Sequence, residues 1–226
     1  MHDKFPDSLE KVVALCFDPD GSLIAASDVF SIEQATTVRV FGGPEWKETI
    51  VGRLRVRASA LTLSADGHWI AIGTAKGEVA IEPWDRHKAL EAVHWATREG
   101  THKNTSVLKF DGAGERLLIG SQGALEVRSN RSGENFRQLW FQPFGKDSLP
   151  FLSEPPVAID CGWTLMAIAH DGVVEILNPK TFERTQTIEV SDVDGLVLTA
   201  QGWLTAHRSG TFQAIEAQHC GRHSGC

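Results

Sequence analysis

The chain has 226 residues, 42% apolar and 23% charged, which is typical of one large globular domain or two small ones. Its net charge of −7 lacks the basic surface on which nucleic-acid-binding and anionic-membrane-binding proteins rely, so we expect neither partner. No apolar run approaches the roughly 20 residues of a membrane span, and the first residues lack the pattern of a signal peptide, so the expected location is the cytoplasm.

Along the chain, five segments repeat one pattern: an apolar strand, a turn with glycine, a second apolar strand, another turn and an alternating strand. The first turns recur about every 40 to 48 residues and carry Gly21, Gly67, Gly114, Gly162 and Gly202. The second turns follow about eight to ten residues later and carry Gly77, Gly123, Gly172 and Gly210. Glycine supplies the positive φ that a tight hairpin turn requires.

A more polar fourth strand is predicted after the first four repeats, at residues 47–51, 89–95, 136–141 and 184–190. Too little apolar sequence follows the fifth repeat for such a strand. The other terminus offers only residues 1–10, where Pro6 cannot donate to a central ladder. Four strands in each repeat of this length are typical of a β-propeller blade.

Three stretches carry a resemblance to the WD-repeat β-propeller family: Phe17–Ala25, Leu63–Gly73 and Asp171–Ile176. The resemblance runs from about Lys11 to Ala217 and implies four-stranded blades around a central channel, with protein docking and no catalysis. The chain departs from the family pattern in that its one Trp-Asp dipeptide, Trp84-Asp85, lies too late to end a third strand, and we interpret it as coincidence.

We therefore predict an all-β chain, a β-propeller of about five four-stranded blades whose last blade is incomplete. A β-sandwich or meander is the alternative, but it does not explain the paired glycines. The predicted boundaries are an N-terminal arm at 1–10, a propeller at 11–217 and a C-terminal tail at 218–226, with blades near 11–52, 53–96, 105–142, 156–191 and 195–217.

The sequence contains no nucleophile elbow, phosphate-binding loop, dinucleotide fingerprint or His-Glu-x-x-His motif. We therefore predict that the chain is not an enzyme and binds no cofactor. Four aspartates recur near the first turns, and we interpret them as turn-capping residues rather than acid–base groups: Asp18, Asp66, Asp111 and Asp160.

The cysteines fall into two groups, one in apolar runs and one in the C-terminal tail. Cys16 and Cys161 lie in apolar runs and are expected to be reduced core residues. In the tail, the spacing of Cys220, His223 and Cys226 is compatible with zinc, but a frayed terminus is favoured and no metal is predicted.

Three tryptophans follow first-turn glycines: Trp69, Trp163 and Trp203. Packing between blades is the favoured interpretation, and sugar stacking is the alternative.

The predicted docking face is formed by two long loops between blades, at residues 96–104 and 143–155. The second loop is rich in Phe, Leu and Pro and is either a lid over the blades or a contact surface. The predicted partner-binding residues are Phe144, Leu149, Phe151, Leu152, Arg98 and His102.

The predicted function is a non-catalytic protein-interaction module, a subunit or regulator of a larger cytoplasmic assembly. The partner is expected to be a protein, and another subunit could complete the open blade edge at Thr211–Ile215. The alternative function is a propeller that binds a sugar or another small molecule.

Overall fold

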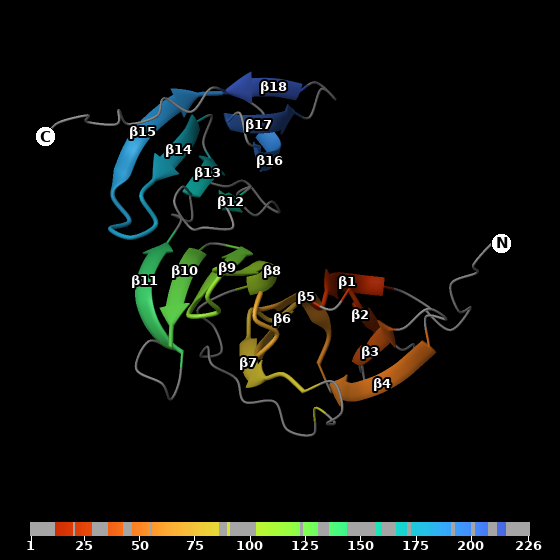
Figure 1. The fold of residues 1–226 in the computed structure, drawn as a ribbon. Coiled ribbons are helices and arrows are strands. Elements are labelled where there is room, and N and C mark those ends of the chain that lie inside the picture. Colours follow the sequence, from red (N-terminus) through yellow and green to blue (C-terminus); the bar gives the residue numbers. More distant parts are fainter. Residues whose placement is uncertain are drawn as a thin grey trace, which may run out of the picture. The chain divides into compact units, whose positions relative to one another are not determined.

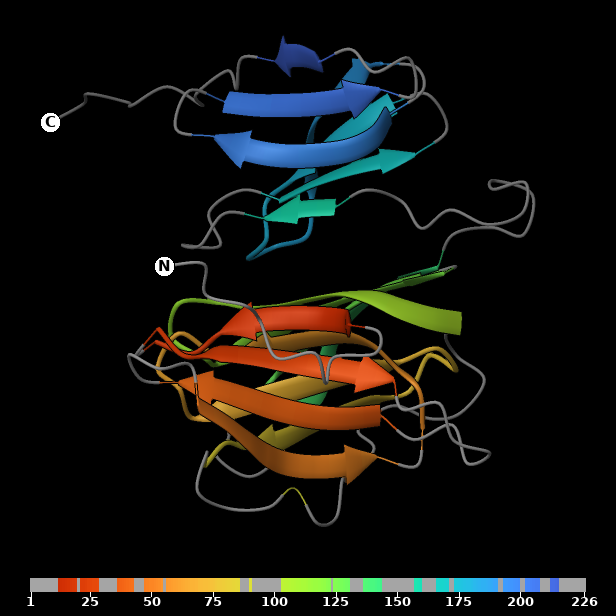
Figure 2. The same ribbon diagram turned by 90° about the vertical axis from the view of Figure 1, so that its right-hand side faces the viewer.

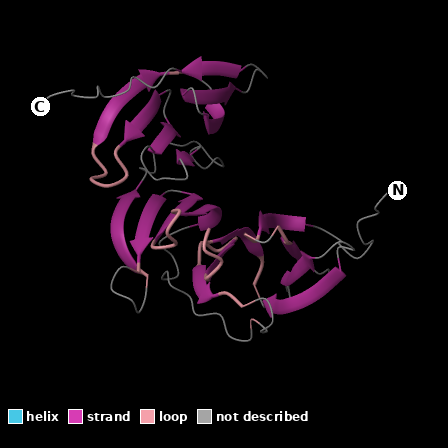
Figure 3. Cartoon of the chain, viewed as in Figure 1, coloured by secondary structure: helices cyan, strands magenta, loops and turns pink. Residues whose placement is uncertain are grey.

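The computed structural model describes residues 12–19, 21–28, 36–42, 47–54, 56–85, 90, 103–122, 124–130, 136–143, 157–159, 166–170, 173–190, 193–199, 202–207 and 212–215. Every regular element in these residues is a β-strand, which confirms the all-β prediction (Figure 3). In the same residues, no helix could cross a membrane.

The strands form five antiparallel sheets, each with its strands in chain order (Figure 1). The first sheet contains β1 (Val12–Phe17), β2 (Leu23–Asp28), β3 (Thr36–Gly42) and β4 (Lys47–Leu54). The second contains β5 (Ala58–Leu63), β6 (Trp69–Thr74) and β7 (Val79–Pro83). The third contains β8 (Lys103–Phe110), β9 (Arg116–Gln122), β10 (Ala124–Ser129) and β11 (Arg137–Pro143). The fourth contains β12 (Val157–Ile159), β13 (Met166–His170), β14 (Val173–Leu177) and β15 (Arg184–Glu189), and the fifth contains β16 (Val193–Thr199), β17 (Gly202–His207) and β18 (Phe212–Ile215).

The predicted fourth strands are present as β4, β11 and β15. Of the strand predicted at 89–95, only Leu90 is described, and it forms a parallel bridge with Gly52 of β4. The fifth sheet has three strands within the described residues, and β18 is its outer strand.

Glycine is required at the hairpin turns because of backbone conformation. Gly21, Gly67 and Gly114 in the first turns have φ values of 86°, 71° and 68°, and Gly77 in a second turn has 84°. At Gly21 an added Cβ would meet nothing within 4 Å, so the positive φ alone disfavours other residues there. Gly202, predicted in a turn, is instead the first residue of β17.

The first three sheets belong to one compact unit and the last two to another. In the first unit β5 lies against β1 on one side and against β8 on the other, so the first strands of successive sheets are neighbours. Figure 2 shows the first sheet face-on, with β1 to β4 side by side.

The core of the first unit lies between sheets. One face of the first sheet packs on the second through Ile24, Ala26, Val38, Val40, Ala58, Leu61, Ile70 and Ile72. Ala71 lies between Ile70 and Ile72 on β6 and points the other way, into a cluster with Phe110, Leu117 and Ile119 of the third sheet. The strand is therefore apolar on both faces, as its sequence predicts. Each large side chain buried there contributes roughly 1.5–3 kcal/mol.

The second unit repeats this arrangement on a smaller scale. Ala167 and Ala169 of β13 and Val174 and Ile176 of β14 form one cluster with Leu196 of β16. The four residues of β13 and β14 occupy alternate positions of their strands, so they share the face of the fourth sheet that packs on β16.

Close approach between sheets is set by small residues on the second strands. A Cβ built on Gly73 would lie 2.6 Å from Cγ2 and 2.8 Å from Cβ of Thr105, which lies on the first strand of the next sheet. The Oγ1 atom of Thr105 is buried and has no hydrogen-bond partner. The close approach of the Thr105 side chain to Gly73 is therefore a van der Waals contact and involves no hydrogen bond of the Thr105 hydroxyl.

We predict that Gly73→Ala lowers the free energy of unfolding by about 2 kcal/mol, because the new methyl group overpacks this junction. Thr105→Ala should cost less, and combining it with Gly73→Ala should recover most of the loss, since the two side chains compete for one space. Urea unfolding of the four proteins measures the coupling. Additive losses in the double variant would contradict this account.

Candidate functional site

The predicted docking residues lie outside the residues that the structure describes: Phe144, Leu149, Phe151, Leu152, Arg98 and His102. The tail residues Cys220, His223 and Cys226 and the loop residue Trp163 also lie outside them, whereas Trp203 is part of β17. Within the described residues, no three His, Cys, Asp or Glu side chains are grouped as metal ligands would be.

Trp69 packs between two sheets, which confirms the packing interpretation for this residue. Its ring lies 5.4 Å from that of Phe136, centroid to centroid, in an edge-to-face arrangement with an interplanar angle of 84°. Phe136 also contacts Phe110. Such pairs contribute about 0.5–1.5 kcal/mol beyond the burial of their area. The indole is therefore partly buried against the aromatic residues of the third sheet.

Two of the four aspartates stabilise turns, as predicted. Asp111 accepts hydrogen bonds from the backbone N–H groups of Glu115 (2.8 Å) and Arg116 (3.0 Å), and its other oxygen lies 2.9 Å from Nε of Arg116. Asp66 accepts from the Ser64 hydroxyl and from the backbone N–H of His68. Burial raises the pKa of Asp66, but these hydrogen bonds and the nearby His68 outweigh it, so the net pKa is lowered from 3.8.

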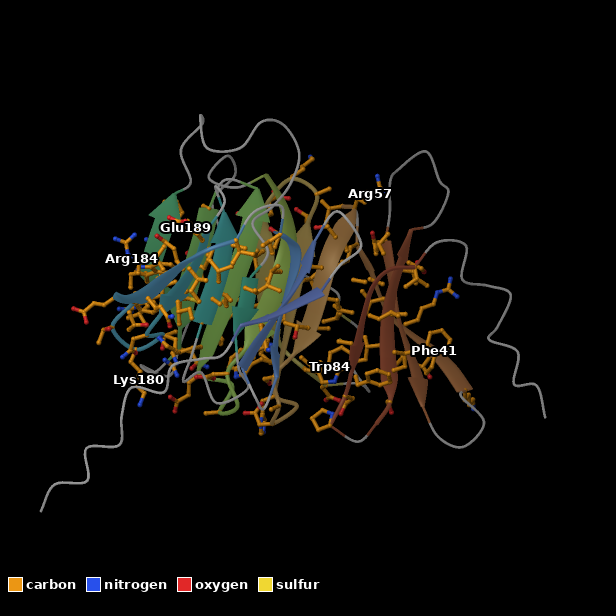
Figure 4. The ribbon with its side chains drawn as sticks, turned by 90° about the horizontal axis from the view of Figure 1, so that it is seen from above. Phe41, Arg57, Trp84, Lys180, Arg184 and Glu189 are labelled. Atoms are coloured by element: carbon orange, nitrogen blue, oxygen red, sulfur yellow. The ribbon has the colours of Figure 1, made fainter. Side chains whose placement is uncertain are left out.

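Asp18 connects two sheets, and this role was not predicted. Its Oδ2 atom accepts a hydrogen bond of 3.0 Å from Nε1 of Trp84. Trp84, which is labelled in Figure 4, follows the third strand of the second sheet. Trp84 also packs on the apolar cluster between these two sheets, so it combines a packing role with a polar contact across the sheet junction. A tryptophan that can bury its ring and still donate a hydrogen bond suits such a boundary.

Two buried glutamates occupy equivalent positions on the third strands of their sheets. Glu126 lies opposite Ile119 and pairs with Arg128 at 2.6 Å, and Glu175 lies opposite Ile168. Glu175 pairs with Arg184 of β15 at 2.7 Å. Each carboxylate is thus compensated by a guanidinium, which is how charge is retained in a protein interior.

Cys16 is a structural thiol. It is partly buried and packs on the cluster between the first and second sheets. Burial, helped by the charge of Asp18, raises the pKa of the thiol to about 12, although a backbone hydrogen bond from Leu63 acts in the opposite direction. The thiolate, which is the nucleophilic form, is therefore suppressed at neutral pH.

One face of β1 carries three exposed apolar side chains, which we call the β1 surface: Val12, Leu15 and Phe17. They are 38%, 54% and 67% exposed. Their cross-strand partners are Ser27, Ala25 and Leu23, alternate residues of β2, and an irregularity after Val12 keeps all three on one face. The other face of β1 packs on the second sheet through Val13, Ala14 and Cys16.

Phe110, the last residue of β8, occupies the position that Phe17 has at the end of β1. Phe17 and Phe110 each end the first strand of their sheet, but Phe17 lies on the face of the first sheet that is turned away from the second sheet, whereas Phe110 lies on the face of the third sheet that packs on the second. Phe110 is 6% exposed because it packs on the second sheet, in a cluster with Ala71 and Val79. The sequence carries no signal for this difference, because Val-Val-Ala-Leu-Cys-Phe resembles the first strand of any other repeat.

No protein-family profile matches the chain, and no curated protein sequence matches it. Among solved structures, it resembles the periplasmic gluconolactonase PpgL of Pseudomonas aeruginosa, with a TM-score of 0.66 and 13% sequence identity. The match covers 91% of this chain and 66% of the lactonase, so the chain spans less than two thirds of that structure. The likeness shows that the fold is a β-propeller, as predicted.

The same comparison contradicts the prediction that the chain is not an enzyme. That prediction rested on absent nucleophile and cofactor motifs, whereas the matched propeller is an enzyme, a lactonase. Absence of those motifs is therefore no argument against catalysis on this fold.

We predict that Asp111→Ala lowers the free energy of unfolding by about 3 kcal/mol, because it removes both the hydrogen bonds to the turn and the carboxylate that faces the largely buried Arg116 guanidinium. Asp66→Ala, at the same turn of the preceding sheet, should cost only about 1 kcal/mol, because its carboxylate is more exposed. Chemical unfolding of the two variants provides the comparison. Equal losses of unfolding free energy in the two variants would contradict the explanation that burial of the Asp111–Arg116 ion pair makes the difference.

Proposed function

We propose that the chain is a protein-binding β-propeller that docks a partner through the β1 surface, as a subunit or regulator of a larger assembly. The observation that carries the proposal is the exposure of Val12, Leu15 and Phe17 along one face of one strand. Among the described residues, only one other large apolar side chain is as exposed, Leu139 on β11.

Scattered apolar side chains are normal on a protein surface, whereas contiguous ones often mark a contact site. Three on one strand face form a contiguous strip, and a phenylalanine and a leucine are effective anchors when a partner removes them from water. Leu139, by contrast, is the irregular residue of its strand, between Gln138 and Trp140, which pair with successive residues of β10. The loop residues predicted from the sequence, such as Phe151, remain a prediction for the same function.

The test is affinity capture with the purified full chain as bait and extract of the native host as prey. We expect a double variant, Leu15→Glu with Phe17→Glu, to lose a partner that the unchanged chain retains. Leu139→Glu is the matched control, since its side chain is 55% exposed against 54% for Leu15. It should retain the partner.

The exposed positions contribute little to the folded core, so both variants should keep their melting temperature within about 2 °C of the original. Capture that is equal in all three proteins would contradict docking at the β1 surface. A large fall in melting temperature of the double variant alone would show instead that Leu15 and Phe17 are core residues.

A second candidate is binding or hydrolysis of a sugar lactone, supported by the resemblance to a gluconolactonase at a TM-score of 0.66. It continues the small-molecule alternative drawn from the sequence, although Trp69 is not available for stacking because it packs on Phe136.

Hydrolysis of glucono-δ-lactone, followed by acid release, tests this second candidate. A rate above the spontaneous one that disappears after heat denaturation, measured with and without added divalent cations, would support it. A rate equal to the buffer blank under both conditions would exclude this substrate.

A further inference from the structure

We infer that an internal water molecule is hydrogen-bonded to the hydroxyl of Thr105 and connects the first strands of the second and third sheets. The inference goes beyond the proposed function, because it assigns a binding site inside the first unit rather than on its surface. It follows from a buried hydroxyl, from irregularities in both strands and from the contrast with the junction between the first and second sheets.

The hydroxyl of Thr105 lies in the interior. Thr105 is 0% exposed, and its Oγ1 atom has no hydrogen-bond partner among the residues that the structure describes. The close approach to Gly73 involves Cβ and Cγ2 of Thr105 and does not use Oγ1. The large majority of buried polar side-chain atoms in proteins are hydrogen-bonded, either to protein atoms or to ordered water. A water molecule is therefore the expected partner of this hydroxyl.

Other hydroxyl groups lie next to Thr105. Ser59 on β5 donates its hydroxyl to the backbone oxygen of Thr105. Ser121 is the cross-strand partner of Thr105 and is 1% exposed, and its hydroxyl donates to the backbone oxygen of Ala124 at 3.2 Å. A hydroxyl that donates one hydrogen bond also has lone pairs that accept. Buried water typically makes about two to four hydrogen bonds, and these side chains supply partners of the right kind.

The strands on both sides of this junction carry β-bulges. The register shifts once in β5, and it shifts on both sides of Thr105 in β8. The extra residues in these bulges are Ser59, Asn104 and Ser106. A bulge takes backbone groups out of the ladder, so the N–H and C=O groups at these positions are further candidates to bind the water molecule.

The junction between the first and second sheets has the same construction but is apolar. Its bulge lies at Val13 of β1, and the next residue pairs with Ala26, just as the residue after the bulge of β5 pairs with Gly73. The equivalent positions are Val13, Ala26 and Ala58 at the first junction, and Ser59, Gly73 and Thr105 at the second. The first three belong to one apolar cluster, which needs no water. The second three are polar or smaller, which favours a water molecule there.

Thr36 supplies a hydroxyl at the first junction that has no counterpart at the second. Its Oγ1 atom accepts a hydrogen bond of 3.0 Å from the N–H of Ala58. The corresponding residue of the second sheet is Gly77, since Thr36 and Gly77 each lie two residues before the strand partner of Ala26 or Gly73. Glycine has no hydroxyl with which to reach the third sheet. The water molecule beside Thr105 takes the place of that side chain.

A crystal structure of the full chain, at a resolution that shows ordered water, tests the inference directly. We expect a water molecule about 2.5–3.0 Å from Oγ1 of Thr105 in the unchanged chain, and an equivalent one in Thr105→Ser, which keeps the hydroxyl. It should be absent from Thr105→Val, which has the same shape without the hydroxyl. A structure in which Oγ1 bonds to a protein atom, or in which no water lies within hydrogen-bond distance of it, would overturn the inference.

Thermal unfolding provides a second measurement that does not depend on crystals. Thr105→Val should lower the melting temperature by about 2–4 °C, because a hydrogen-bonded hydroxyl is lost. Thr36→Val is the matched control, since it removes a buried hydroxyl whose partner is the N–H of Ala58, and its melting temperature should fall by a similar amount. Removal of a buried hydroxyl that has no partner stabilises a protein. A melting temperature that stays the same or rises in Thr105→Val would therefore also overturn the inference.

Discussion

Face-to-face packing of successive sheets is the constraint on which the first unit depends. Its centre is β6, where Ile70 and Ile72 pack on the first sheet and Ala71 packs on the third. Within β6, Ile72 is followed by Gly73. Because glycine has no side chain, Thr105 of the third sheet can approach the strand closely at this point. The hydrogen bond from Trp84 to Asp18 connects the ends of the first two sheets and adds to the apolar packing between them.

The same constraint makes the β1 surface unusual. Every first strand is the edge of its own sheet, and β5 and β8 are covered by the sheets before them. In β1 the face toward the second sheet is packed, but Leu15 and Phe17 on the opposite face remain exposed. Burying apolar area stabilises by roughly 25 cal/mol per Å², so an uncovered strip of this kind favours association. The proposed docking at the β1 surface rests on this exposure of Leu15 and Phe17.

The strands and hairpin turns could be predicted from the sequence because their signals are local. Gly21, Gly67 and Gly114 mark turns of positive φ, and the apolar runs between turns have the length of strands. The role of Trp84 could not be predicted, since its partner Asp18 is 66 residues away. The exposure of Phe17 could not be predicted either, because its own strand resembles the strand that ends in buried Phe110, and only the neighbouring sheet distinguishes them.

The most direct test of this account is hydroxyl-radical footprinting of the dilute chain, read at three phenylalanines by mass spectrometry. Phe17 is 67% exposed, Phe110 is 6% exposed and Phe41 is fully buried. Because all three have the same intrinsic reactivity, their oxidation rates report access of solvent to each ring. The account predicts that Phe17 is oxidised several-fold faster than Phe110 and Phe41. Oxidation of Phe17 as slow as that of Phe110 would contradict it, because the β1 surface would then be covered within a single chain.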